Sequence, residues 1–325
     1  MEVTTELTGP FPRSEALVTA TRDLDRGRTT PEAVEELYRS TEREVLQLES
    51  RLSLAPATGG YLRWADLFRP IAESWTGFTV GPVTRWFETN TFYRQPILTA
   101  PPERVPGALD RWFPSASHGR NGHAWKVLLP GPYTFARMLD NRSGETPEAL
   151  THRLGRLLAE EVRGLRSAEY HSFQFQEPLL VVDPPEGAAA ESVVAAYQAL
   201  APALDGVRST VWTYFGDASP AGPLLRRLPV GVVGFDLAET DLDHLPDLGG
   251  HRGLGLGCID PRTTLIEDPG DLVQVVRAVS SKLRPASLLL GPGAGLDLLP
   301  WEPATRKLHT LPAARQLLEQ GAKGA

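Results

Sequence analysis

The segment Arg85–Asn90 holds a cation, two aromatic rings, a carboxylate and an amide within six residues, and Phe92 and Tyr93 follow it closely. This mixture is typical of a ligand cleft, where apolar groups shape the wall and a few polar groups fix orientation. Four of its side chains are therefore predicted to contact a ligand: Arg85, Trp86, Glu88 and Asn90. The alternative is an aromatic loop packed over the end of a barrel, and the sequence leaves both open.

Carboxylates follow several short apolar runs of β-forming residues. They are Glu177, Asp217, Asp236 and Asp260. The carboxyl ends of parallel strands meet at one edge of a sheet, so these groups are expected on one rim. Glu177 and Asp236 are candidates for holding an ammonium group or the edge of a ring. A buried carboxylate bonded to backbone groups or to an arginine would give the same pattern.

The sequence contains no recognised metal-binding or nucleophile motif. His118 and His123 are five residues apart in a glycine-rich loop, which is not a recognised zinc spacing. Cys258 is the one cysteine and has no evident base beside it, and no Gly-x-Ser-x-Gly occurs. The sequence predicts no metal bound by this chain and leaves the catalytic residues unknown.

The elements that must position these groups alternate between strand-like and helix-like segments. Strands are predicted near 127–129, 173–175, 209–214, 230–235, 253–259 and 287–290. Helices are predicted at 32–54, 146–165, 189–204, 220–227, 269–283 and 304–320. This alternation predicts a parallel sheet of the (β/α)8 barrel type. A doubly wound sheet is less favoured because no Gly-x-Gly-x-x-Gly follows an early strand.

Domain organisation is predicted to be simple. Residues 55–125 are rich in proline, glycine and aromatics, and we expect them to form an extended loop or hairpin excursion over the barrel mouth. No linker interrupts the sequence, so residues 1–325 are predicted to form a single barrel domain. The glycine-rich stretch 291–295 lacks the Lys-Ser/Thr of a P-loop.

Composition narrows the class of protein. Of the 325 residues, 41% are hydrophobic and 22% charged, the balance of a soluble globular protein, and the net charge of −7 disfavours nucleic acid as a partner. A single cysteine suits a reducing cytoplasm, and residues 1–9 contain no apolar run typical of a signal peptide. No stretch approaches the roughly 20 apolar residues of a membrane span. A cytoplasmic location is expected.

Five short blocks, taken together, resemble one known family. Thr8–Arg13 is similar to a Gly-x-Phe-Pro-Arg turn, and Arg85–Asn90 to a Trp-Phe-Asp-Thr-Asn segment in which Glu88 replaces Asp. Leu129–Thr134 contains Pro-Gly-Pro-Tyr-Thr, Gln174–Pro178 resembles Gln-x-Asp-Glu-Pro, and Thr213–Gly216 reads Thr-Tyr-Phe-Gly. In this order they resemble the cobalamin-independent methionine synthases, and specifically the amino-terminal barrel of that family as a stand-alone chain.

The resemblance implies methyl transfer from a methyl-folate, or another methyl donor, to homocysteine. The family activates homocysteine as a zinc thiolate, because zinc lowers the pKa of the thiol. Its zinc ligands are a His-x-Cys pair, a Glu and a late Cys. The corresponding positions here read Thr213-Tyr214-Phe215, Asp236 and Ala294. The resemblance therefore implies that zinc is bound only by a partner.

The resemblance also suggests ligand contacts. In the family's catalytic half, the Asp of Asp-Glu-Pro helps to hold the ammonium group of the substrate, and here the neutral Gln176 stands at that place, followed by Glu177. A folate would offer a flat pterin for Trp86 and carboxylates for cations. The cations expected near the mouth include Arg13, Arg85 and Lys126. Ordinary surface ion pairing is the alternative for each of them.

The function expected is that of a zinc-free donor-binding or scaffolding subunit beside a zinc-bearing catalytic barrel. Its ligand would be folate-like or homocysteine, and Trp64, Trp75 and Trp112 are candidates for the partner surface. One alternative is a self-sufficient metal-free barrel enzyme, related to corrinoid methyltransferases or uroporphyrinogen decarboxylases, with Glu177 and Asp236 as acid and base. Another is a non-catalytic paralogue.

Overall fold

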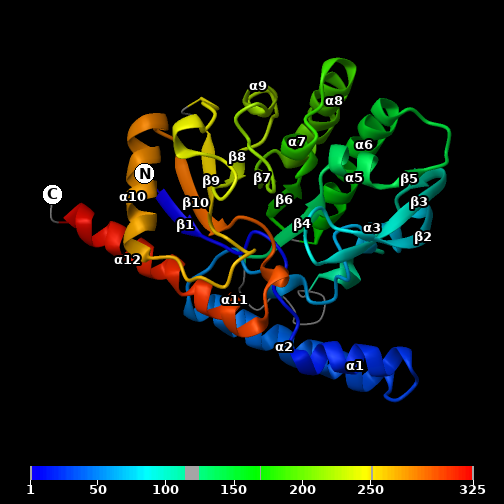
Figure 1. Cartoon of the computed structure of the whole chain (residues 1–325). Coiled ribbons are helices and arrows are strands. Elements are labelled where there is room, and N and C mark those ends of the chain that lie inside the picture. The colour runs from blue at the N-terminus through cyan, green and yellow to red at the C-terminus, as the bar shows by residue number, and fades with distance from the viewer. Residues whose placement is uncertain (1, 114–123, 169, 250–251, 324–325) are drawn as a thin grey trace.

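A curled parallel sheet forms the centre of the computed structural model, which describes residues 2–113, 124–168, 170–249 and 252–323 (Figure 1). Its strand order is β1-β10-β9-β8-β7-β6-β4, and every neighbouring pair is parallel. The strands are β1 (Glu2–Thr5), β4 (Lys126–Pro130), β6 (Ser172–Gln176), β7 (Arg208–Trp212), β8 (Val232–Asp236), β9 (Gly253–Ile259) and β10 (Ser287–Pro292). The predicted α/β class is confirmed.

The sheet has seven strands among the described residues, one fewer than the eight expected. The edge strands β1 and β4 are linked through residues 55–57. Ala55 N donates to Thr5 O at 3.1 Å, Ala57 N donates to Ala124 O at 2.8 Å, and Lys126 N donates to Ala57 O at 2.9 Å. Pro56 has no N–H to donate, which limits this segment to isolated bonds instead of a strand ladder.

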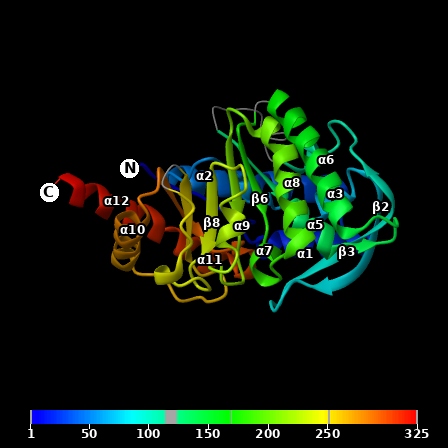
Figure 2. The same ribbon diagram turned by 90° about the horizontal axis from the view of Figure 1, so that it is seen from above.

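Helices follow the strands along the chain. The longer ones are α1 (Glu15–Asp25), α2 (Pro31–Arg51), α6 (Pro147–Ser167), α8 (Gly187–Leu204), α10 (Pro269–Leu283), α11 (Trp301–Leu308) and α12 (Thr310–Lys323). The short ones are α3 (Arg69–Ala72), α5 (Pro132–Met138), α7 (Leu179–Val182) and α9 (Gly222–Leu225). Seen from above, α6 lies beside α8 toward one end of the sheet and α10 lies near α12 toward the other (Figure 2).

Three of the long helices begin with the same local signal. Thr30, Thr146 and Asp268 each accept a hydrogen bond from a backbone N–H of the first turn, and a proline follows each of them. The cap satisfies a donor that the helix leaves free, and the proline occupies a position where no N–H is needed. These starts agree with the predicted helices.

Residues 76–103 form a hairpin outside the main sheet. Strands β2 (Thr76–Arg85) and β3 (Phe92–Glu103) are antiparallel, and β3 also pairs with the short β5 (Asp140–Asn141). The excursion over the mouth stays a prediction. Trp64 and Trp75 are buried, so the prediction that they form an exposed partner surface is wrong. His118 and His123 lie outside the described residues.

Among the described residues, no helix combines the length and the apolar character that crossing a membrane would require.

Candidate functional site

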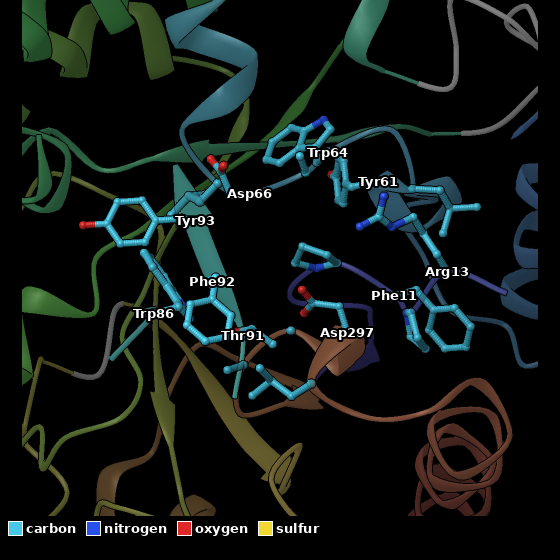
Figure 3. A pocket seen from close by; sticks show the side chains of 18 of the residues that line it. Phe11, Arg13, Tyr61, Trp64, Asp66, Trp86, Thr91, Phe92, Tyr93 and Asp297 are labelled. Atoms are coloured by element: carbon cyan, nitrogen blue, oxygen red, sulfur yellow. The ribbon is translucent and has the colours of Figure 1, made fainter. Parts of the chain in front are cut away.

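A cavity of about 560 Å³ lies at the carboxyl end of the sheet (Figure 3). The segment after β1 borders it, and so do residues 61–67, the turn of the β2–β3 hairpin, and the loops after β7 and β10. Parallel α/β folds commonly bind ligands at this edge of the sheet. We refer to this cavity as the mouth pocket.

Aromatic rings form one wall of the mouth pocket. Trp86 contacts Phe87, Tyr93 and Phe68, with ring centroids 4.8, 5.5 and 5.8 Å apart and the rings edge to face. Phe87 also contacts Phe215 across the hairpin turn at 5.5 Å. These geometries are favourable for aromatic pairs and fix the wall without occupying the cavity.

Phe87 and Phe215 share an uncommon backbone conformation. Their φ angles are 47° and 67°, in the left-handed region that L-residues rarely adopt. One lies in the hairpin turn and the other in the loop after β7, so the ring contact ties two strained turns together. Strain of this kind collects at ligand-binding sites.

Arg13 and Asp297 point into the mouth pocket from different segments (Figure 3). Within the described part of the chain, neither side chain forms an ion pair or a hydrogen bond with another side chain. Asp297 is solvent-exposed on the pocket side, although many protein atoms surround its carboxyl. Its reduced hydration raises its pKa to about 6, and Arg13 opposes this rise.

Asp66 also lines the pocket, but its oxygens are occupied. It accepts hydrogen bonds from the backbone N–H groups of Phe68, Arg69 and Arg94 at 2.9, 2.8 and 3.1 Å. Burial is the main cause that raises its pKa. These bonds fix the start of α3 against the start of β3, so Asp66 supports the wall.

Gln176, at the end of β6, offers an unsatisfied acceptor to the pocket. Its side chain is 3% exposed, and its Nε2 donates to Thr8 O at 2.7 Å. That bond fixes the orientation of the amide, because the reversed amide would face one oxygen with another. The remaining oxygen, Oε1, has no hydrogen-bond partner in the part of the chain that the structure describes. A buried acceptor left unpaired is costly, so a ligand donor would relieve it.

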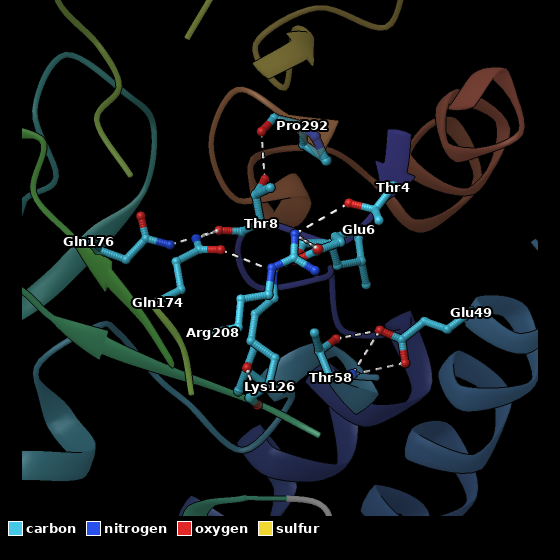
Figure 4. Close-up of polar contacts among 12 residues, drawn as sticks. Thr4, Glu6, Thr8, Glu49, Thr58, Lys126, Gln174, Gln176, Arg208 and Pro292 are labelled. Atoms are coloured by element: carbon cyan, nitrogen blue, oxygen red, sulfur yellow. Dashed lines mark hydrogen bonds and ion pairs between the residues drawn. The ribbon is translucent and has the colours of Figure 1, made fainter. Parts of the chain in front are cut away.

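A buried ionic network lies beneath this corner (Figure 4). Glu6 pairs with Lys126 at 2.7 Å and also with Arg208. Lys126 Nζ donates to Leu7 O at 2.6 Å and to Gln174 Oε1 at 3.0 Å. Burial lowers the pKa of Lys126, and the Glu6 carboxylate opposes that change. The network fixes the chain after β1, and Lys126 does not line the pocket.

Glu177 supports a helix and does not face the mouth pocket. Its carboxylate accepts from Tyr133 N at 3.1 Å, Thr134 N at 2.8 Å and the Tyr197 hydroxyl at 3.2 Å. A Cβ on Gly131 would lie 2.1 Å from its carboxyl carbon, so only glycine fits there. The Pro-Gly-Pro-Tyr-Thr block and Glu177 thus form one structural unit at the start of α5. Burial raises the pKa of Glu177 to about 7.

Asp236 has a comparable backbone role. It is buried, accepts from Ala238 N at 3.0 Å, and is 3.5 Å from Phe215 N. Burial is the main cause that raises its pKa. It therefore holds the loop that carries Phe215 and does not line the mouth pocket.

The structure brings four of the nine predicted site residues to the pocket: Arg13, Trp86, Asn90 and Gln176. The other five do not line it: Arg85, Glu88, Lys126, Glu177 and Asp236. Arg85 is exposed and donates to Thr89 O at 2.6 Å, which stabilises the hairpin turn. Glu88 is exposed in the same turn.

Several pocket residues were not predicted from the sequence. They include Phe11, Tyr61, Trp64, Tyr214, Phe215 and Asp297. Tyr214 and Phe215 lie in the Thr213–Gly216 block, and Asp297 lies two residues after the glycine-rich stretch 291–295, so the sequence contained a signal for these three residues. Nothing in the sequence identified Tyr61 as a pocket residue, and Trp64 was predicted at a partner surface instead.

The residues at the implied zinc positions do not fit a zinc ion. Phe215 and Ala294 cannot ligate a metal, and Asp236 is bonded to the backbone. Burial raises the pKa of the Cys258 thiol to about 12, and that residue lies on β9. No group of three or more His, Cys, Asp or Glu side chains is arranged for a metal in the residues that the structure describes.

The space inside the sheet below Ala294 is filled by Trp212. The indole packs with Tyr214, Leu289 and Ala294, and its Nε1 donates to Gly293 O at 2.7 Å. A Cβ at Gly234 would lie 2.0 Å from the indole, so this strand must carry glycine to admit it.

Comparison with known proteins agrees with the sequence blocks. The family model for the N-terminal domain of cobalamin-independent synthase matches residues 71–284. Methionine synthase of Saccharolobus solfataricus is 24% identical over 326 residues, covering 98% of this chain and 96% of the relative. A B12-independent methionine synthase from Shewanella sp. W3-18-1, solved with selenomethionine, has a TM-score of 0.78 at 16% identity, covering 99% of both chains.

A putative B12-independent methionine synthase from Listeria monocytogenes has a TM-score of 0.72 at 15% identity, with 98% of this chain and 99% of that one covered. At such identities the solved structures establish the fold, which is of the methionine-synthase barrel type. The family model covers more than half of the residues and establishes the family. The chain belongs to the cobalamin-independent methionine synthase family, through the N-terminal domain of that family.

Proposed function

We propose that this chain is a zinc-free, donor-binding subunit in methyl transfer from a methyl-folate to homocysteine, and that it acts with a separate zinc-bearing barrel. One observation carries the proposal. The mouth pocket combines an aromatic wall with Arg13 and a Gln176 oxygen that have no side-chain partner among the described residues, whereas Phe215 and Ala294 stand where the family places zinc ligands.

The pocket suits a flat ligand with an acidic end. Its volume of about 560 Å³ is in the usual range for a small-molecule site. Trp86 and Phe215 offer ring faces and edges to a pterin, and Asn90 can both donate to and accept from a ring edge. The guanidinium of Arg13 is free to pair with a carboxylate.

The acceptor step is assigned to a partner because a thiol needs activation. At neutral pH, homocysteine is mostly protonated, and the family supplies a metal to generate the thiolate. The β2–β3 hairpin also carries exposed apolar residues, including Val83 and Phe92, both 57% exposed. We propose that the hairpin covers the mouth and that this surface meets the partner barrel, in an interface of at least ~1,200 Å².

The alternative of a metal-free acid–base enzyme has less support. Glu177 and Asp236 were its proposed acid and base, and both accept hydrogen bonds from backbone N–H groups away from the mouth pocket. A general acid or base must reach the reacting proton, directly or through one water molecule.

Calorimetric titration of the purified chain with 5-methyltetrahydrofolate tests donor binding. Asn90→Ala and Trp86→Leu are expected to weaken binding at least about fivefold, because each removes a pocket contact. Glu88→Gln is the matched control, since Glu88 lies in the same turn but does not line the pocket. Wild-type protein that binds no folate, or a loss of affinity equal in all three variants, would contradict donor binding.

The subunit role needs a second experiment. The chain would be mixed with a zinc-containing methionine synthase that carries the His-x-Cys pair, and both complex formation and methyl transfer to homocysteine would be measured. The proposal expects a complex at micromolar concentrations and a lower KM for the donor. Unchanged turnover without a complex would rule out the partnership and leave donor binding to be judged by the titration.

A further inference from the structure

Asp297 and Gln176 both offer acceptor oxygens to the mouth pocket, and Asp297 lies outside the five sequence blocks that resemble the family. Gln176 Oε1 is buried without a partner, and the Asp297 carboxylate faces the same cavity without a side-chain partner among the described residues. Gln176 Oε1 is buried and unsatisfied, and the Asp297 carboxylate is exposed to the pocket, so a ligand with two N–H or O–H donors could satisfy the first and replace water at the second.

Arg13 supplies the complementary charge. It lines the same cavity and influences Asp297 electrostatically, yet no ion pair joins the two in the described structure. Opposite charges that share a pocket without contact leave room for a ligand between them. Such a ligand is dipolar, with a donor-rich end and an anionic end.

Resting on the proposed function, we propose that Asp297 and Gln176 together bind the N–H-rich edge of the ligand's heterocycle, while Arg13 binds its acidic tail. Asp297 is then a specificity-determining residue of the donor site. A heterocycle with adjacent ring N–H and amino groups, as in a pterin, presents the donors that these acceptors need. A simple dicarboxylate would leave the buried Gln176 Oε1 unpaired and would bring a second negative charge toward Asp297.

The neighbouring ionisable groups single out Asp297 as the pH-sensitive acceptor. Asp66 is bonded to three backbone N–H groups, and Arg22 of α1 lines the pocket as well. Burial raises the pKa of Tyr214 well above 10, so its hydroxyl stays neutral. The pKa of Asp297 is about 6, so its carboxylate is mostly ionised at pH 7.5 and mostly protonated at pH 5.

The test is calorimetric titration with two probes at several pH values. The first probe is 5-methyltetrahydrofolate, and the second is 4-aminobenzoylglutamate, which has the acidic tail but no pterin. Asp297→Asn is expected to weaken binding of the first probe at least about tenfold at pH 7.5, since it removes a charge-assisted bond, and to leave the second unchanged. Arg13→Gln is expected to weaken both.

Proton linkage provides a readout that a purely structural role would not move. Binding of an N–H donor to the carboxylate favours its ionised form, so wild-type protein should release protons on binding near pH 6 and lose affinity as the pH falls from 7.5 to 5. The ionisations of the ligand are the same for every variant. Asp297→Asn should therefore lack the part of the pH dependence that belongs to Asp297, and Asp297→Glu should retain it.

Asp205→Asn is the matched control, since Asp205 is exposed at the other end of the sheet, before β7. If wild-type protein binds the folate and Asp297→Asn shows the same affinity and the same proton release, the assignment of Asp297 is wrong and the donor site stands. If wild-type protein binds neither probe, the assignment and the proposed function fail together.

Discussion

Replacing Glu177 by Gln should change how the stability of the protein depends on pH. Burial in the protein raises the pKa of this carboxyl from 4.5 to about 7, although three donors contact it. A carboxyl whose pKa is higher in the folded than in the unfolded state favours folding below the unfolded pKa. That contribution is lost as the pH rises from about 4.5 through about 7.

The size of the effect follows from this difference in pKa. At about 1.4 kcal/mol per pH unit, ionising Glu177 in the folded protein costs about 3 kcal/mol by pH 8.5. Gln cannot ionise, so Glu177→Gln avoids this cost. Its amide nitrogen would face a backbone donor in place of an acceptor, which costs about 1 kcal/mol at any pH.

Urea unfolding at pH 5 and pH 8.5 measures both the cost of ionising Glu177 and the cost of the misplaced Gln amide. Glu177→Gln is expected to be about 1 kcal/mol less stable than wild type at pH 5 and about 2 kcal/mol more stable at pH 8.5. Glu186→Gln, an exposed residue before α8, is the control and should show no such reversal. A Glu177→Gln protein that is less stable by the same amount at both pH values would show that the three donors keep Glu177 ionised, and the argument from burial would be wrong.

Three further predictions concern packing and metal content. Glu6→Gln leaves Lys126 and Arg208 without their buried partner and should lower the free energy of unfolding by about 3–5 kcal/mol in urea titrations; a loss under 1 kcal/mol would contradict the buried network. Gly234→Ala places a methyl group against the Trp212 indole and should lower the free energy of unfolding by about 1–3 kcal/mol in the same titrations, whereas Gly231→Ala meets only ordinary contacts and should be near neutral. Elemental analysis of protein purified under reducing conditions should find zinc below stoichiometric amounts, and stoichiometric zinc that a chelator removes would overturn the assignment of zinc to the partner.

The sequence predicted β4, β6, β7, β8, β9 and β10 correctly. Nearly all of their residues are buried, as is typical of parallel strands covered on both faces, although β6 alternates polar and apolar residues. β1 was not predicted because Glu2–Thr5 contains only one apolar residue, Val3, and lies at an edge of the sheet. The β2–β3 hairpin was not predicted as strands because its prolines and glycines are more typical of loops.

The candidate site was harder to predict for a physical reason. A carboxylate at the end of a strand can face a ligand or bind the backbone, and residue type alone does not separate the two. Glu177 and Asp236 bind the backbone, because adjacent loops present N–H groups that would otherwise be buried without partners. Asp297 faces the cavity instead, and only the three-dimensional arrangement distinguishes it from them.

The positions of the polar groups at the sheet edge bear on whether this chain binds the methyl donor or activates the acceptor. Along the interior of the sheet, Trp212 and its neighbours fill the space with apolar atoms, so a charged thiolate there would lose its hydration without gaining a cation. The polar groups that remain free lie to one side, in the mouth pocket, where Arg13, Gln176 and Asp297 face an aromatic wall. This arrangement suits a neutral heterocycle with an acidic tail better than a thiol nucleophile. It supports the proposal that the chain holds the methyl donor and that a partner activates the acceptor.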